Sequence, residues 1–63
     1  MITCRLYTTV EGERYMTYLQ LTEANKRAEA EDVVRKFKQI FPEVGRIRWV
    51  LKCGNNIIDM GLV

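Results

Sequence analysis

The side chains that most enzymes use for proton transfer and nucleophilic attack are scarce in this chain. It contains no His and no Ser, which removes the usual general base and the usual catalytic triads. The threonines Thr8 and Thr9 and the cysteines Cys4 and Cys53 have no base beside them in the sequence. A cysteine without a neighbouring base is far more often a packing residue than a nucleophile. We therefore predict that the protein is not an enzyme.

The sequence also lacks the patterns that hold metals, cofactors or phosphates. The two cysteines form no Cys-x-x-Cys pair, and there is no His to complete a zinc site. The four glycines form no phosphate-binding loop. The carboxylates Glu29, Glu31 and Asp32 are clustered, but Arg and Lys follow them at helical spacing, as on a solvated helix. We expect no cofactor and no bound metal.

The chain begins with a strand-like alternation and shows no secretory leader. No apolar run reaches the ~18 residues that a membrane span needs. We therefore expect a cytoplasmic protein with no membrane contact. Because the cytosol is reducing, we expect Cys4 and Cys53 to be free, buried thiols, although neighbouring strands could bring them close together.

Residues 1–63 are enough for one small α+β domain and no more. Residues 2–10 and 14–21 alternate like strands, and Glu11-Gly12 between them predicts a tight hairpin turn. Keeping the apolar side chains on one face sets the register of this hairpin. The expected cross-strand pairs are Leu6–Thr17, Cys4–Leu19 and Ile2–Leu21.

A helix is predicted to begin between Thr22 and Asn25 and to end before Pro42. Its apolar residues recur at helical spacing. They are Ala30, Val33, Val34, Phe37, Ile40 and Phe41. Residues 46–53 and 57–63 are expected to form a second hairpin around a Gly-Asn-Asn turn.

The element order ββαββ predicts a four-stranded antiparallel sheet of order 2-1-3-4, with the helix packed on one face. Strict alternation assigns the side chains that face the helix. They are Ile2, Cys4, Leu6, Leu19, Leu21, Ile47, Trp49, Leu51, Ile58, Met60 and Leu62.

A single helix leaves the other face of the sheet uncovered. We call this the open face, and alternation predicts its side chains. They are Thr3, Arg5, Tyr7 and Thr9, then Arg14, Met16, Tyr18 and Gln20, then Arg46, Arg48, Val50 and Lys52, and finally Ile57, Asp59, Gly61 and Val63. This set holds five of the ten basic residues and one of the eight acidic residues.

Basic, aromatic and Met side chains on one uncovered face favour a binding surface, because these types are enriched at interfaces. The predicted binding residues are Arg5, Tyr7, Arg14, Met16, Tyr18, Arg46, Arg48 and Lys52. The competing interpretation is a sheet face that only meets water, where Arg, Tyr and Thr are also common.

Three functions fit these features. The first is an inhibitor or adaptor that docks on an acidic protein or nucleoprotein, by analogy with small phage and mobile-element proteins such as anti-CRISPR proteins. The second is a DNA- or RNA-binding module that uses the same face. The third is a structural homo-oligomer. Strand 57–63 has one charge and no Pro or Lys, so it is the predicted seam of a homodimer.

Overall fold

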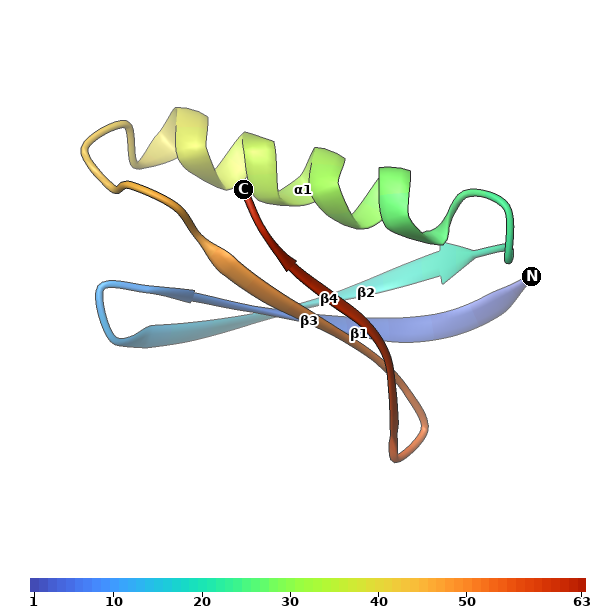
Figure 1. Cartoon of the computed structure of the whole chain (residues 1–63). Helices are drawn as coiled ribbons and strands as arrows, with labels where there is room; N and C mark the ends of the chain where they lie inside the picture. The colour runs from blue at the N-terminus through green and yellow to red at the C-terminus, as the bar shows by residue number, and fades with distance from the viewer.

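The computed structural model describes residues 1–63 and confirms the predicted ββαββ architecture. The strands are β1 (Ile2–Val10), β2 (Glu13–Leu21), β3 (Arg48–Cys53) and β4 (Asn56–Leu62), and the helix α1 spans Lys26–Ile40. They form one antiparallel sheet of order β2-β1-β3-β4. In Figure 1 the helix lies along one side of the sheet and leaves the other side uncovered.

The first hairpin has the predicted register, including the Leu6–Thr17 and Cys4–Leu19 pairs. Its two turn residues, Glu11 and Gly12, have φ angles of 51° and 83°. Positive φ at both central positions matches the right-handed twist of the flanking strands. The tight turn therefore aligns β1 and β2 without a slip that would exchange their faces.

The helix starts after a turn that Thr22 and Asn25 close reciprocally. The Asn25 Oδ1 accepts from the Thr22 backbone N–H at 2.8 Å, and the Thr22 Oγ1 accepts from the Asn25 N–H at 3.3 Å. The helix buries Ala30 and Val34 completely. Ile40, which its helical spacing grouped with these apolar residues, does not join the packing: it is 69% exposed. At about 100° per residue it lies at the margin of the apolar stripe.

The core lies between the helix and the sheet. Trp49, on the central strand β3, is its largest fully buried side chain. The fully buried apolar residues are Cys4, Leu6, Val10, Leu21, Ala30, Val34, Ile47, Trp49 and Leu51. Phe37 packs partly buried against Tyr15, with 5.4 Å between ring centroids. No helix combines the length and the apolar character required to cross a membrane.

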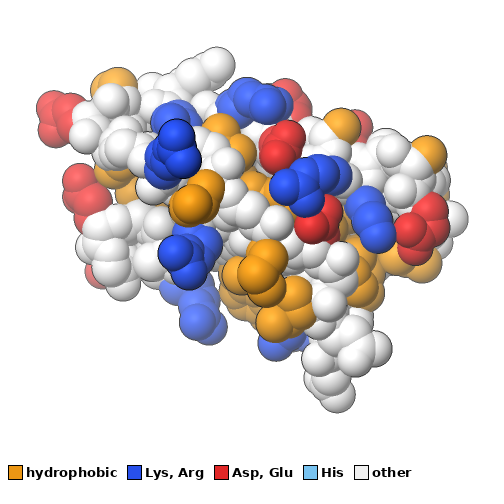
Figure 2. Space-filling model, in the orientation of Figure 1, with side chains coloured by type: hydrophobic (Ala, Val, Ile, Leu, Met, Phe, Trp, Pro, Cys, Tyr) orange, Lys and Arg blue, Asp and Glu red, His pale blue; other side chains and the backbone are white.

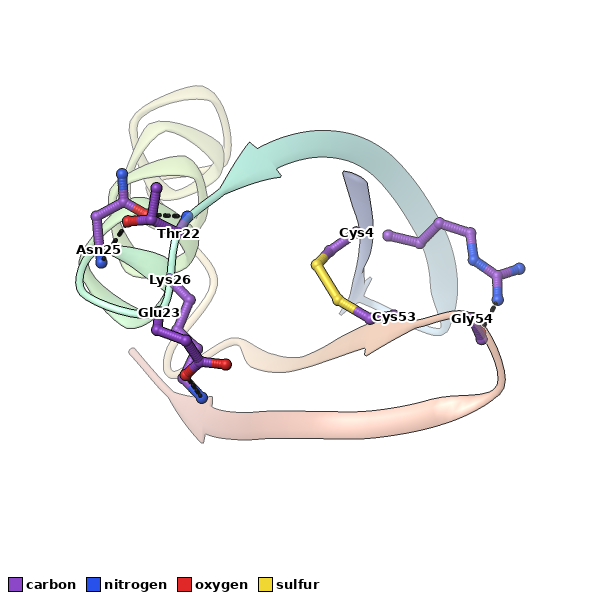
Figure 3. Close-up of a disulfide and its surroundings, with 8 residues drawn as sticks. Cys4, Thr22, Glu23, Asn25, Lys26, Cys53 and Gly54 are labelled. Carbon is purple, nitrogen blue, oxygen red and sulfur yellow. Dashed lines mark hydrogen bonds and ion pairs between the residues drawn. A yellow bond between two sulfur atoms is a disulfide. The ribbon is translucent and has the colours of Figure 1, made fainter. Parts of the chain in front are cut away.

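Cys4 and Cys53 form a disulfide between the two central strands, so the prediction of two free thiols is wrong (Figure 3). The register explains the pairing, because Arg5 lies opposite Lys52 and the next pair along β1 and β3 is Cys4 and Cys53. Their Cα atoms are 4.6 Å apart, within the range that a disulfide spans. The predicted proximity and inward orientation of the two cysteines are confirmed. The bond between them was not predicted because a reducing environment was assumed.

Strand β4 is where the predicted alternation fails. Lys52 pairs with Ile57, but Leu51 pairs with Asp59, so Ile58 is an extra residue that forms a bulge. The bulge reverses the faces of the residues that follow it. Met60 and Leu62, predicted inward, lie opposite Val50 and Arg48 on the open face. Asp59, Gly61 and Val63, predicted on the open face, lie on the helix side.

Trp49 and Gly61 give this reversal a physical reason. A Cβ atom added to Gly61 would lie 2.9 Å from a Trp49 ring carbon, closer than atoms pack. The indole therefore lies against a position that only glycine leaves open. The Arg27 Cζ also lies 5.5 Å from the centroid of the Trp49 ring, and the Arg27 guanidinium pairs with Asp59 of β4 at 2.8 Å.

Candidate binding surface

The pairing of the four strands arranges the open-face side chains in three parallel rows that cross the sheet from β2 to β4. The apolar row is Met16, Tyr7, Val50 and Met60. The first basic row is Arg14, Thr9, Arg48 and Leu62. The second basic row is Tyr18, Arg5, Lys52 and Ile57. Cationic side chains thus lie on both sides of an apolar strip.

Two shallow hollows lie along the apolar row and share Arg48 and Val50 in their walls. One, of about 370 Å³, is lined by Tyr7, Thr9, Arg14, Arg48, Val50, Lys52 and Ile57. The other, of about 360 Å³, is lined by Arg48, Val50, Met60, Gly61 and Leu62. We call these two adjoining hollows the groove; its β1 end is basic and its β4 end is mostly apolar.

Three cations surround the ring of Tyr7. The Arg14 and Arg5 Cζ atoms lie 5.6 and 5.8 Å from the ring centroid, and the Lys52 Nζ lies 5.9 Å from it. Arg5 also donates to the Gly54 carbonyl oxygen in the β3–β4 turn. The aromatic ring offsets part of the repulsion among these cations, but it supplies no full negative charge.

No acidic side chain neutralises this surface. Each of the five ion pairs of the protein contains a residue of α1. None involves Arg5, Arg14, Arg48 or Lys52. Because the bulge turns Asp59 toward Arg27, the three rows contain no acid at all, one fewer than predicted. In Figure 2, basic and apolar side chains lie together without acidic ones in the lower part of the view, whereas signs alternate above.

Seven of the eight predicted binding residues lie on the open face. Tyr7, Arg14, Arg48 and Lys52 line the first hollow, and Arg5 adjoins it through the Tyr7 ring. Met16 and Tyr18, on β2, are 43% and 65% exposed. Arg46 is exposed but precedes β3, and it lines neither hollow.

Sequence reasoning missed two apolar members of this surface. Met60 and Leu62 are 54% and 50% exposed on the open face. Gly61 was the signal that could have placed them, because a glycine inside a strand often marks a bulge or a close approach. Its neighbours would then have been assigned to the side opposite the indole.

Strand β4 is an edge of the sheet, as predicted, and no second chain is present to test a homodimer through residues 57–63. The bulge at Ile58 interrupts regular pairing near the start of the strand, which is one way that edges are protected. The homodimer stays a prediction.

Comparison of the chain with protein-family models, with curated proteins and with solved structures found no match.

Proposed function

We propose that this protein is a non-enzymatic binding protein that docks through its open sheet face on an acidic surface of another protein. By covering that surface it acts as an inhibitor or an adaptor. The observation that carries the proposal is the combination of unpaired cations and exposed apolar side chains on one acid-free face. Such a face gains both apolar burial and charge complementarity when an acidic partner covers it.

The arrangement of the open face lowers the stability of the isolated protein, which supports a role in binding rather than in folding. Arg5 and Lys52 lie directly opposite one another on neighbouring strands. Like charges in that position destabilise a sheet. Exposed Met60 and Leu62 likewise contribute little to the core while they face water. An acidic partner with an apolar centre would remove both penalties.

A protein partner fits this face better than a single-stranded nucleic acid. Bases bind such sheets by stacking on free aromatic rings. Of the two tyrosines on the face, Tyr7 at its centre is already approached by three cations of the chain itself, and Tyr18 is a single exposed ring on the edge strand β2. Met16, Ile57, Met60 and Leu62 instead offer the aliphatic contacts that are typical of protein interfaces.

The test compares two double variants of equal charge change in affinity capture from nuclease-treated lysate of the source cells. Arg48→Glu with Lys52→Glu reverses two cations of the open face, and Lys36→Glu with Lys38→Glu reverses two on the helix. We expect the sheet variant to lose a partner protein that the wild type and the helix variant both retain. Thermal melts establish that both variants are folded.

Two results would contradict the proposal. Loss of the partner with the helix variant but not with the sheet variant would make α1 the binding surface. Capture of the partner by the wild type from untreated lysate but not from nuclease-treated lysate, together with a steep dependence of affinity on salt, would make nucleic acid the ligand.

The cytoplasmic location stays a prediction; the Cys4–Cys53 disulfide of the structure favours an oxidising compartment instead, and the state of this bond in cells provides the test. Cytosolic thiols are kept reduced, and disulfides are typical of oxidising compartments. Rapid alkylation of intact cells at lysis, followed by mass spectrometry, measures the state of Cys4 and Cys53. Modification of both residues is expected for a cytoplasmic protein, and an unmodified disulfide would place the protein in an oxidising compartment. The phage or mobile-element origin rests on size alone and stays a prediction.

A further inference from the structure

The three rows of the open face have dimensions that restrict what can lie on them. Strands in a sheet are about 4.8 Å apart, so a row that crosses four strands is roughly 14 Å long. Residues two apart on a strand are separated by about 6.7 Å, so the two basic rows lie roughly 13 Å apart, with the apolar row midway. The groove along the apolar row follows the same direction.

These dimensions match one side of an α-helix. A helix with its side chains is about 10–12 Å across, and roughly nine of its residues span 14 Å. An extended segment in the same place would set its polar backbone against Tyr7 and Val50, where no strand is available to satisfy its hydrogen bonds. A helix satisfies its backbone internally and presents only side chains to the groove.

We propose that the part of the partner that docks here is an amphipathic α-helix with an apolar stripe flanked on both sides by carboxylates. This inference rests on the proposed function and specifies its ligand. The apolar stripe packs on the aliphatic side chains of the apolar row, Met16, Val50 and Met60, beside the Tyr7 ring that the three cations surround. The helix axis crosses the strands of the sheet.

Each flank of such a helix meets a separate pair of cations. Arg14 and Arg48 stand on one side of the groove, and Arg5 and Lys52 stand on the other. None of the four has an acidic partner in the protein. Arg guanidinium groups pair with carboxylates through two parallel hydrogen bonds, which gives the contact direction as well as energy.

Two synthetic helical peptides of identical composition test this geometry. Both carry the same stripe of Leu residues; the first has Glu on both flanks of the stripe and Gln on the far face, and the second exchanges Glu and Gln. Fluorescence anisotropy measures their affinity for the full chain. We expect the first peptide to bind at least about tenfold more tightly, the sum of several partly exposed ion pairs.

Single substitutions in the protein test whether both flanks are engaged. Arg48→Gln removes a cation from the first basic row, and Lys52→Gln removes one from the second. We expect each substitution to lower the affinity for the first peptide several-fold and to leave the affinity for the second peptide unchanged. Lys38→Gln, on the helix, is the matched control and should change neither affinity.

Three results would overturn the inference. Equal binding of the two peptides would show that the flanking carboxylates do not contribute to recognition. Dependence of the affinity on only one basic row would show that the helix does not lie across the groove between the two rows. Neither would affect the proposed function, which the capture experiment tests separately. Tighter binding of a single-stranded oligothymidine than of the first peptide, with a steeper salt dependence, would show that the groove selects phosphates.

Discussion

The two exposed sides of this small protein differ in how their charged side chains are paired. On the helix side, Glu31 and Asp32 pair with Arg35 and Lys36 one turn later, and Arg27 bridges Glu31 and Asp59. On the sheet side, Arg5, Arg14, Arg48 and Lys52 have no acidic partner. Most helix charges are paired within the fold, whereas the four sheet charges have no acidic partner. A binding surface for an acidic partner requires that imbalance.

The contrast extends to apolar side chains. Residues of α1 that face the sheet, such as Ala30 and Val34, are fully buried. Met60, Leu62 and Ile57, at the β4 end of the open face, are about half exposed. Aliphatic groups and unpaired cations are thus concentrated on the same side of the molecule. Neither feature stabilises the isolated chain, and both become favourable when a partner covers the face.

The largest expected effect concerns the cross-link beneath the open face. The Cys4–Cys53 bond joins residues 49 apart in sequence. Closing a loop of that length stabilises a fold by about 4 kcal/mol in the chain-entropy account. We expect a reducing agent to lower the free energy of unfolding of the wild type by about that amount. The measurement is denaturant unfolding with and without reductant.

The control for this effect is the double variant Cys4→Ser with Cys53→Ser, whose stability should not respond to reductant. A wild type that is equally stable in both conditions, with two thiols by mass, would show that the sheet side is held without the bond.

A smaller effect tests which side of β4 faces the helix. Gly61→Ala places a methyl group against the Trp49 indole and should destabilise the fold by about 1–3 kcal/mol, the usual cost of overpacking. Gly45→Ala is the matched control, because no atom lies within 4 Å of the added Cβ. Thermal melts of the two variants decide the matter. Equal melting temperatures of the two variants would contradict the contact between Gly61 and Trp49 and would indicate that Gly61 and Asp59 lie on the open face.

The smallest effect concerns the charges themselves. Lys36→Gln breaks the pair with Asp32 and should lower stability by about 0.3–0.5 kcal/mol. Lys52→Gln relieves the repulsion with Arg5 and should raise stability by a few tenths of a kcal/mol. Both changes should shrink at high salt, because salt screens exposed charges. Destabilisation by Lys52→Gln that persists at high salt would mean that Lys52 stabilises the fold by packing.

Sequence patterns predicted the strands, the helix and their order because each element carries a local signal. The Glu11-Gly12 turn and the apolar residues of β1 and β2 together leave a single favourable register. The single helix then determines which face is open. Most of the candidate surface follows from alternation on β1, β2 and β3, where no residue interrupts the period.

What could not be predicted depends on contacts between elements. The bulge at Ile58 is a local insertion that alternation cannot detect. Because of it, the prediction assigned Met60, Leu62 and Asp59 to the wrong faces of the sheet. The disulfide follows from the pairing of β1 with β3, but whether it forms depends on the compartment. The groove arises from how long basic side chains stand around Tyr7 and Val50, which requires coordinates.

Lysine footprinting of the complex tests the central claim most directly, because the chain has four lysines and only Lys52 lies on the open face. Lys26, Lys36 and Lys38 belong to the helix and serve as internal controls. Acetylation of the free protein and of its captured complex, followed by peptide mass spectrometry, compares all four residues in one sample. We expect Lys52 to be modified in the free protein and protected in the complex, with the helix lysines modified in both. Protection of Lys36 and Lys38 with Lys52 still modified would contradict the assignment of the open face as the binding surface.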